Sequence, residues 1–207
     1  MNTLLVFVHP LKTGSFNHAL KQIAEAEVEN LLVSDLYAMD FKAAADFDDF
    51  EGEGFQRQYT LAQKEACIQN RFTADIKQEQ DKLLWCDLLI LQFPLWWFST
   101  PAILKGWLDR VLAKGFAYDK GQWFEQGLMK GKKAILVITT QSGQEAYSPQ
   151  GVHGPIDMYL SHLHHTLKLV GFSIETPFIA YGVDGGSIEL RQSALKEYQK
   201  KLAHLTK

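Results

Sequence analysis

The sequence predicts an α/β fold in which helices cover both faces of a parallel β-sheet. Two observations support this prediction. Short apolar runs rich in branched side chains have the length and composition of strands that are buried on both faces. Segments with the spacing of amphipathic helices separate these runs, and strands that alternate with helices pair in parallel. The expected strands are residues 3–8, 29–36, 87–93, 133–140 and 172–181.

Composition narrows the class of protein and of partner. The 207 residues, of which 46% are hydrophobic, suit one domain over residues 1–207. The formal net charge is -3 with acids and bases mixed, which argues against nucleic acid and for a small-molecule ligand. No apolar run approaches the ~20 residues that cross a bilayer, and no basic leader precedes the first strand, so we expect a cytoplasmic protein. Cys67 and Cys86 lack metal-ligand spacing and should stay reduced, and no metal site is predicted.

The first expected strand leads directly into a helix. His9 begins the connecting loop, and the residues from Ser15 to Asn17 open the helix. Unpaired N–H groups and the positive end of the helix dipole gather at such a start. With hydroxyls from Thr13 and Ser15 and the amide of Asn17, this loop is a natural phosphate site. The competing interpretation is an ordinary capped helix without a ligand.

Residues 38–58 have no clear period, and we expect them to form an irregular excursion from the fold. Their acidic residues lack the fixed ligand and glycine positions of a calcium loop, so we expect a solvated loop rather than a metal site. These acidic residues are Asp46, Asp48, Asp49, Glu51 and Glu53. Residues 59–86 then predict one or two helices. The later helix should place Ile76, Leu83 and Leu84 inward.

Three adjacent aromatic side chains, Trp96, Trp97 and Phe98, follow the third expected strand. They cannot all face one core, because neighbouring residues of a strand or a helix point in different directions. At least one of them should therefore face a planar ligand, a partner chain or a neighbouring loop. Packing within the core is an equal alternative.

The helix after the aromatic residues should begin near Pro101, with Ser99 or Thr100 as its cap. Apolar residues then recur at helical spacing, which predicts one buried face. The residues of this face are Ile103, Leu104, Trp107, Leu108, Val111 and Leu112.

Ligands of open parallel sheets bind beyond the carboxyl ends of the strands, where the strand order reverses. We expect four segments there, which are residues 9–17, 94–98, 139–153 and the variable segment 116–124. The first offers phosphate donors, the second offers contacts for a flat ring, and the third contains Tyr147 and His153. Together they indicate a mononucleotide with a planar head group. Three later histidines are expected to be structural, namely His162, His164 and His165.

Several motifs in register resemble those of the NAD(P)H:quinone oxidoreductase family, the DT-diaphorase-like flavoproteins. They are, in order, HP, SFN, KEA, DI with EQ, QFPLWWFSTPAILKGWLDRV, GFAY, ITT and YSPQGVHG. The resemblance covers nearly the whole chain. It implies a flavodoxin-like, doubly wound, five-stranded parallel sheet with helices on both faces, and a bound flavin, either FAD or FMN.

The resemblance also implies which residues hold the flavin. Its phosphates and ribityl chain would contact His9, Thr13, Ser15, Phe16 and Asn17. Its ring would lie along Pro94, Leu95, Trp96, Trp97 and Phe98, with Thr139, Thr140, Gln141 and Ser142 at the pyrimidine end. Gln56 would reach the adenine of FAD in a partner subunit. Gln141 and Ser142 depart from the pattern, since better-known members have two glycines there.

Tyr147 and His153 match the catalytic pair of the family. A phenol hydroxyl can stabilise negative charge on a reduced flavin, and an imidazole can supply a proton near neutral pH. The family is homodimeric, so the quinone or related acceptor could be walled from either chain by Tyr118, Trp123, Phe124 and Phe172. The implied activity is hydride transfer from NADH or NADPH through the flavin to a quinone.

Two other functions fit the same resemblance. One is an ancillary regulatory flavoprotein subunit of a glutathione-gated potassium efflux system, associated peripherally with its transporter. The other is a one-electron carrier of the flavodoxin kind. The presence of both Tyr147 and His153 favours the enzyme.

Overall fold

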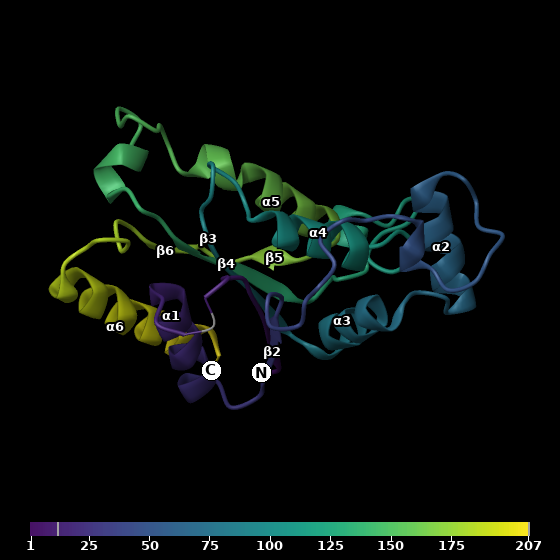
Figure 1. Ribbon diagram of the computed structural model, residues 1–207, viewed down its shortest axis with the longest axis horizontal. Coiled ribbons are helices and arrows are strands. Elements are labelled where there is room, and N and C mark those ends of the chain that lie inside the picture. Colours follow the sequence, from purple (N-terminus) through teal and green to yellow (C-terminus); the bar gives the residue numbers. More distant parts are fainter. Residues whose placement is uncertain (12, 207) are drawn as a thin grey trace.

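The computed structural model describes residues 1–11 and 13–206, so Lys12, within the expected phosphate loop, lies outside the described residues (Figure 1). Its centre is a parallel sheet with the strand order β2-β1-β3-β4-β5, and β6 also pairs with β4. The order reverses between β1 and β3, which confirms the predicted flavodoxin-like arrangement. The strands are β1 Thr3–Phe7, β2 Leu31–Asp35, β3 Leu88–Pro94, β4 Lys133–Thr139, β5 Ser173–Ile174 and β6 Phe178–Ala180.

The fifth expected strand is not continuous, which corrects the prediction of one strand over residues 172–181. Ile174 pairs with Ala134, whereas Phe178 pairs with Val137. Residues 175–177 therefore stand opposite residues 135–136, and the extra residue forms a bulge. Pro177 has no N–H to donate to the ladder, so it lies where pairing is interrupted.

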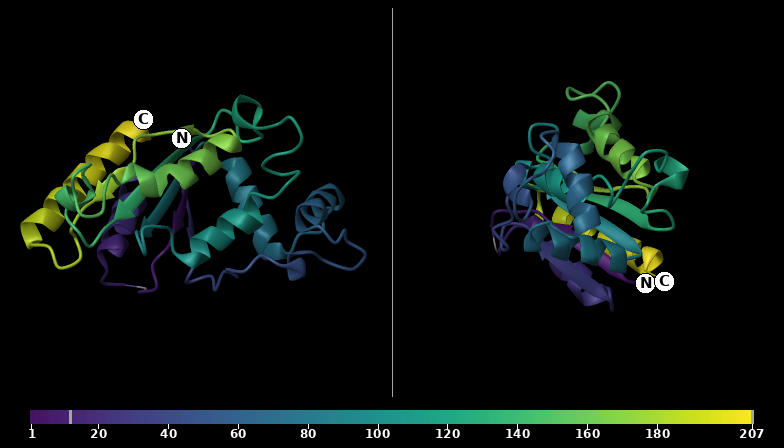
Figure 2. Two further views of the ribbon diagram at one scale, coloured as in Figure 1. Left: turned by 90° about the horizontal axis from the view of Figure 1, so that it is seen from above. Right: turned by 90° about the vertical axis from the view of Figure 1, so that its right-hand side faces the viewer.

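Helices cover both faces of the sheet (Figures 1 and 2). The helices α1 and α6 lie side by side on one face, and α3, α4 and α5 pack on the other. The helix α2 lies at one end, beyond α3 and α4, around a small separate aromatic cluster. The helices are α1 Phe16–Glu27, α2 Tyr59–Gln69, α3 Ala74–Trp85, α4 Ala102–Val111, α5 Asp157–Leu169 and α6 Ile188–Leu205, with short 3-10 turns at Phe47–Asp49, Phe124–Gln126 and Gln144–Tyr147.

Two details of the helices differ from expectation. Pro101, rather than Ser99 or Thr100, occupies the N-cap of α4, and no side chain caps that helix. Leu84 was expected to face inward, but its side chain is 58% exposed. Because Leu83 is buried and neighbouring helical residues point about 100° apart, Leu84 turns towards solvent.

The excursion at 38–58 packs tightly on α4. A Cβ on Gly106 of α4 would lie 1.9 Å from the carbonyl oxygen of Ala43, so only glycine permits this approach. The expectation of a solvated acidic loop is wrong for Asp49, whose side chain is fully buried. Its carboxylate accepts from Arg110 Nε at 2.9 Å and from the Tyr59 hydroxyl at 2.7 Å. Burial, together with that acceptor, raises the pKa of Tyr59 far above its ordinary value.

Arg110 is the centre of a buried ionic cluster. Its guanidinium, 1% exposed, also binds the Asp75 carboxylate at 2.7 Å and stacks over the Phe41 ring at 4.7 Å. Lys42 reaches Asp49 at 3.1 Å from the edge of the cluster. The excursion is thus fixed to α4 by charge pairs as well as by backbone contact. Over the described ranges 1–11 and 13–206, no helix is long and apolar enough to cross a membrane.

Candidate functional site

The amino terminus of α1 lies against the carboxyl ends of β3 and β4. Ser15 caps the helix, since its hydroxyl accepts the N–H of His18 at 3.0 Å. The Asn17 side-chain amide donates to Thr139 Oγ1 at 2.8 Å, and the Gln92 amide donates to the Asn17 carbonyl at 2.6 Å. These contacts place the helix start, with its unpaired N–H groups, at the edge of the sheet where a ligand would bind.

This polar cluster has two buried acceptors without a partner among the described residues. They are Asn17 Oδ1 and Gln92 Oε1. Buried oxygens of this kind are nearly always hydrogen-bonded in native proteins. Gln92 was missed in the sequence, although a glutamine inside the otherwise apolar run of β3 was a usable signal. Because these two oxygens lack a hydrogen-bond donor among the described residues, they favour a ligand with O–H or N–H groups at the start of α1.

The aromatic residues after β3 form a tight two-residue turn. Trp96 and Ser99 exchange both backbone hydrogen bonds, at 3.1 and 2.9 Å. Trp97 and Phe98 have φ of 50° and 59°, and positive φ at both central positions is the mark of a type I′ turn. Their side chains are not core packing, because Trp97 is 95% exposed and Trp96 and Phe98 are about 40% exposed. The core alternative is therefore excluded for all three.

Large side chains in the left-handed region strain the backbone, so we expect Trp97→Asn to stabilise the ligand-free protein. Asparagine tolerates positive φ, and almost no buried surface is lost at Trp97. The expected gain in the free energy of unfolding is about 1 kcal/mol, measured by urea denaturation. Trp123→Asn is the matched control, since Trp123 is also exposed but has an extended φ of -139°. Equal or lower stability of Trp97→Asn would contradict the strain argument.

A cavity of about 550 Å³ opens beside the aromatic turn. The loop after β4 and the segment from Tyr147 to His153 form its other walls. Among the residues that the structure describes, its titratable lining residues are Tyr147 and His153, and no lysine, arginine or carboxylate lines it. The full lining is Leu95, Trp96, Trp97, Phe98, Gln141, Ser142, Tyr147 and His153.

Backbone hydrogen bonds and aromatic packing hold His153 in place. The backbone N–H of His153 donates to the Ala146 carbonyl at 2.9 Å, and the backbone carbonyl of His153 accepts from the Tyr159 hydroxyl. The Phe98 and Tyr147 rings pack on the imidazole at 5.2 and 5.0 Å between centroids. Tyr159 was missed in the sequence, where nothing marks it, yet it also stacks on Phe98 at 4.9 Å.

Tyr147 ends a 3-10 turn and is nearly buried beneath the cavity. Burial, and secondarily the neighbouring Tyr159, raise the pKa of its phenol above the ordinary value. The hydroxyl is protonated at neutral pH, as a phenol ordinarily is, and can donate a hydrogen bond. The structure thus brings Tyr147 and His153 together with the Leu95–Phe98 segment in one cavity.

The residues expected to hold phosphates lie next to this cavity rather than in its wall. Thr139 links the two regions, because its side chain accepts from Asn17 and its carbonyl accepts the N–H of Leu95 at 2.9 Å. Thr140 and Pro94 are buried behind the lining. His9, Ser15 and Phe16 are partly buried, whereas Thr13 and Gln56 are exposed, and Gln56 borders another cavity beside α2.

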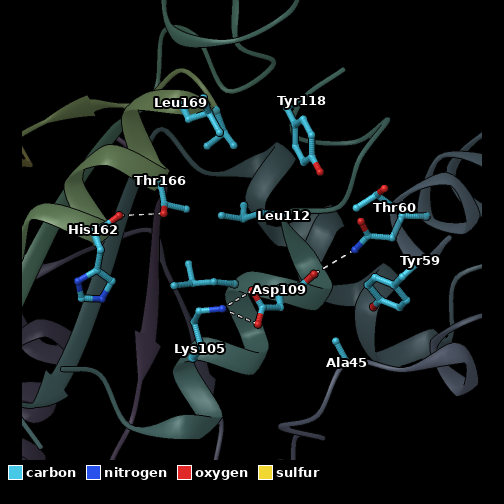
Figure 3. A pocket seen from close by; sticks show the side chains of 13 residues that line it. Ala45, Tyr59, Thr60, Lys105, Asp109, Leu112, Tyr118, His162, Thr166 and Leu169 are labelled. Atoms are coloured by element: carbon cyan, nitrogen blue, oxygen red, sulfur yellow. Dashed lines mark hydrogen bonds and ion pairs between the residues drawn. The ribbon is translucent and has the colours of Figure 1, made fainter. Parts of the chain in front are cut away.

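The expected acceptor walls lie elsewhere in the chain. Tyr118 borders a cavity of about 400 Å³ between α4 and α5, where Figure 3 shows it near Leu112 and Leu169. Phe124 and Phe172 share a third cavity, and Trp123 directly precedes Phe124 in sequence. The segment 116–124 precedes β4 and lines no part of the cavity at His153, which corrects its expected position. If these aromatic residues wall the same site, a second subunit must supply them.

A family model described as a flavodoxin-like fold matches residues 1–203. Ribosyldihydronicotinamide dehydrogenase (quinone) of Mus musculus is 40% identical over 212 residues, which cover 99% of this chain and 91% of that protein. NAD(P)H dehydrogenase (quinone) 1 of Cavia porcellus is 38% identical over 212 residues, covering 98% and 76%.

Solved structures agree with these matches. A crystal structure from Klebsiella pneumoniae, described as that of a candidate quinone reductase, has a TM-score of 0.93 and 39% identity, covering 99% of this chain and 85% of that one. General stress protein 14 of Treponema denticola, solved with FMN, shares the fold at a TM-score of 0.73 and 23% identity, covering 99% of each chain. The chain therefore belongs to the flavodoxin-like family and, within it, to the family of NAD(P)H and ribosyldihydronicotinamide quinone dehydrogenases.

Proposed function

We propose that the protein is a flavin-dependent NAD(P)H:quinone oxidoreductase. It takes a hydride from NADH or NADPH and passes two electrons to a quinone or a related acceptor. The observation that carries this proposal is the meeting of Tyr147, His153 and the exposed aromatic turn in one cavity at the carboxyl ends of β3 and β4. The name of the Cavia porcellus relative supports NAD(P)H as the donor, and the names of both relatives above support a quinone as the acceptor.

The residues present fit a flavin. The capped start of α1 offers free N–H groups to a phosphate, and Asn17 Oδ1 is a buried acceptor that a ribityl hydroxyl could satisfy. The aromatic turn offers an exposed flat surface for a ring. When bound, the flavin supplies a ring that accepts a hydride and gives up two electrons.

The chain's own groups then perform the acid–base work. Tyr147, a protonated phenol at neutral pH, would donate a hydrogen bond to negative charge on the bound ring. His153 moves a proton to and from the same region. The Trp96–Phe98 turn orients donor and acceptor in succession. Over residues 1–11 and 13–206, no lysine, arginine or carboxylate lines the cavity, which suits a neutral quinone.

We extend the proposal to the assembly and the cofactor. The flavin is FAD, the protein is a homodimer, and each site is completed by Tyr118, Trp123, Phe124 and Phe172 of a second subunit, with Gln56 near the adenine. This accounts for four aromatic residues that lie away from the cavity of their own chain. We also propose a cytoplasmic location, where the unbridged Cys67 and the buried Cys86 would stay reduced.

The alternative of an ancillary subunit of a potassium efflux system is not favoured, because the relatives described above are named as dehydrogenases. The one-electron carrier is separated from the enzyme by experiment. Such a carrier would accept hydride from NADH slowly, whereas the enzyme would react directly.

The test uses the purified full-length protein. Its cofactor is released by denaturation and weighed by mass spectrometry, which separates FAD from FMN. Anaerobic stopped-flow mixing with NADH or NADPH, and then with a naphthoquinone, should bleach and restore the visible flavin absorbance. A colourless protein that binds neither flavin, or a flavin that NADH and NADPH leave oxidised, would contradict the proposal.

Asn17→Ala should weaken flavin retention by about 10-fold, the usual scale for one buried hydrogen bond. The measurement is the dissociation constant of the flavin, from fluorescence titration of the stripped protein. Asn30→Ala is the control, since Asn30 is exposed at the opposite end of the sheet. Thermal melting of the stripped variant shows whether loss of the Asn17–Thr139 bond alters folding. Unchanged affinity in a folded variant would remove Asn17 from the flavin site.

A further inference from the structure

We propose that Ser142 is a positioning residue for His153, and this inference rests on the proposed function of that histidine. The Ser142 hydroxyl lies 3.0 Å from His153 Nε2. Both side chains line the same cavity. The bond spans the loop that follows β4 and the segment that precedes α5. It therefore ties together the two walls that face the aromatic turn.

The backbone of Ser142 is itself fixed. Its carbonyl accepts the Thr140 hydroxyl at 2.8 Å, and Thr140 Oγ1 in turn accepts the N–H of Gly182 at 3.4 Å. The Thr140 N–H donates to the Ala180 carbonyl at 3.0 Å, which continues the pairing of β4 with β6. The serine is therefore held by the end of the sheet rather than by a free loop.

The other contacts of His153 leave its ring orientation open. Ala146 and Tyr159 hold the backbone, while Phe98 and Tyr147 pack on the ring without hydrogen bonds to its nitrogens. Among residues 1–11 and 13–206, the Ser142 hydroxyl is the one group that bonds a ring nitrogen of His153. This hydrogen bond orients the ring so that Nε2 faces the loop after β4 and Nδ1 remains for other partners.

A hydroxyl suits a histidine that cycles between two protonation states, because it can accept from the same ring N–H in both of them. With the neutral ring, Nε2–H donates to Ser142 Oγ, so Nδ1 carries no proton and can accept one. With the cationic ring, Nδ1 carries the exchanged proton and Nε2–H still donates to Ser142 Oγ. The same bond therefore persists as the proton comes and goes, and the imidazole does not need to turn during the reaction.

A double-mutant cycle tests this role in the flavin-loaded enzyme. Ser142→Ala should lower the rate of flavin reduction by about 10-fold, the scale of one hydrogen bond, and leave KM for NADH unchanged. In the His153→Ala background the same substitution should cost nothing further, because Ser142 acts through His153. Ser142→Thr keeps the hydroxyl and should restore most of the rate. Ser148→Ala is the control in the same loop region.

NMR of the imidazole nitrogens gives a readout that does not depend on activity. The wild type should show neutral His153 as one tautomer with the proton on Nε2, and Ser142→Ala should show a mixture. Additive rate losses in the cycle, or identical ring spectra, would overturn the role of Ser142. A wild type that NADH and NADPH cannot reduce would overturn the proposed function, while the spectra would still decide whether the bond exists.

Discussion

The His153→Ala protein should retain its flavin yet accept hydride about 10²-fold more slowly than the wild type, the usual scale for a positioned acid or base. The imidazole packs between Phe98 and Tyr147 at the cavity and is held there by its backbone and by Ser142. Its removal takes away the proton partner but leaves the capped start of α1 intact. Stopped-flow reduction under anaerobic conditions measures the rate.

His204→Ala is the matched control for this variant, because His204 is exposed in the last turn of α6 on the opposite face of the sheet. It should react as the wild type does. Flavin content, measured by absorbance after release, separates slow chemistry from a lost cofactor. A His153→Ala protein with full flavin and a full reduction rate would remove His153 from the mechanism.

Arg110→Met should lower the free energy of unfolding by about 3 kcal/mol or more, which would be the largest stability effect among these variants. The substitution keeps a long apolar stem on α4 but strips Asp49 of its buried guanidinium partner. Asp49 is fully buried, and without Arg110 too little positive charge lies near its carboxylate to offset the free-energy cost of burying it. Lys42 and Tyr59 still contact it, so the loss stops short of unfolding the domain.

Lys105→Met tests the same chemistry on the surface of the same helix. Lys105 pairs with Asp109 at 2.6 Å, but both side chains are about half exposed, so the expected change is within ~0.5 kcal/mol. Urea denaturation of both variants gives the comparison. If Arg110→Met were as stable as Lys105→Met, the buried cluster would have no role in fixing the excursion.

The elements that could be predicted are those whose signal lies in consecutive residues. The apolar runs of β1, β3 and β4 and the start of the helix that Ser15 caps were visible because each pattern is local. Asp49 was misjudged because its partner Arg110 lies 61 positions away and only folding brings the two together. A run of acids reads as a solvated surface unless such a partner is known.

The residues of the candidate site also divide into those with a local sequence signal and those whose role depends on distant partners. Tyr147 and His153 stand in one short motif, so the sequence could pair them. The Trp97–Phe98 turn could not be foreseen, because aromatic residues seldom adopt positive φ and propensity argues against it. Ser142 was predicted as a flavin contact that departs from glycine and not as a partner of His153, since its bond to His153 depends on how two loops meet.

The edge strand of the sheet, formed by β5 and β6, affects how readily protein molecules associate at high concentration. Its two segments cover only Ser173–Ile174 and Phe178–Ala180, and Pro177 withholds an amide between them. A second chain would find no continuous row of amides and carbonyls there to extend in register. Concentrated solutions should therefore resist fibre-like association along this border without any need for a covering helix.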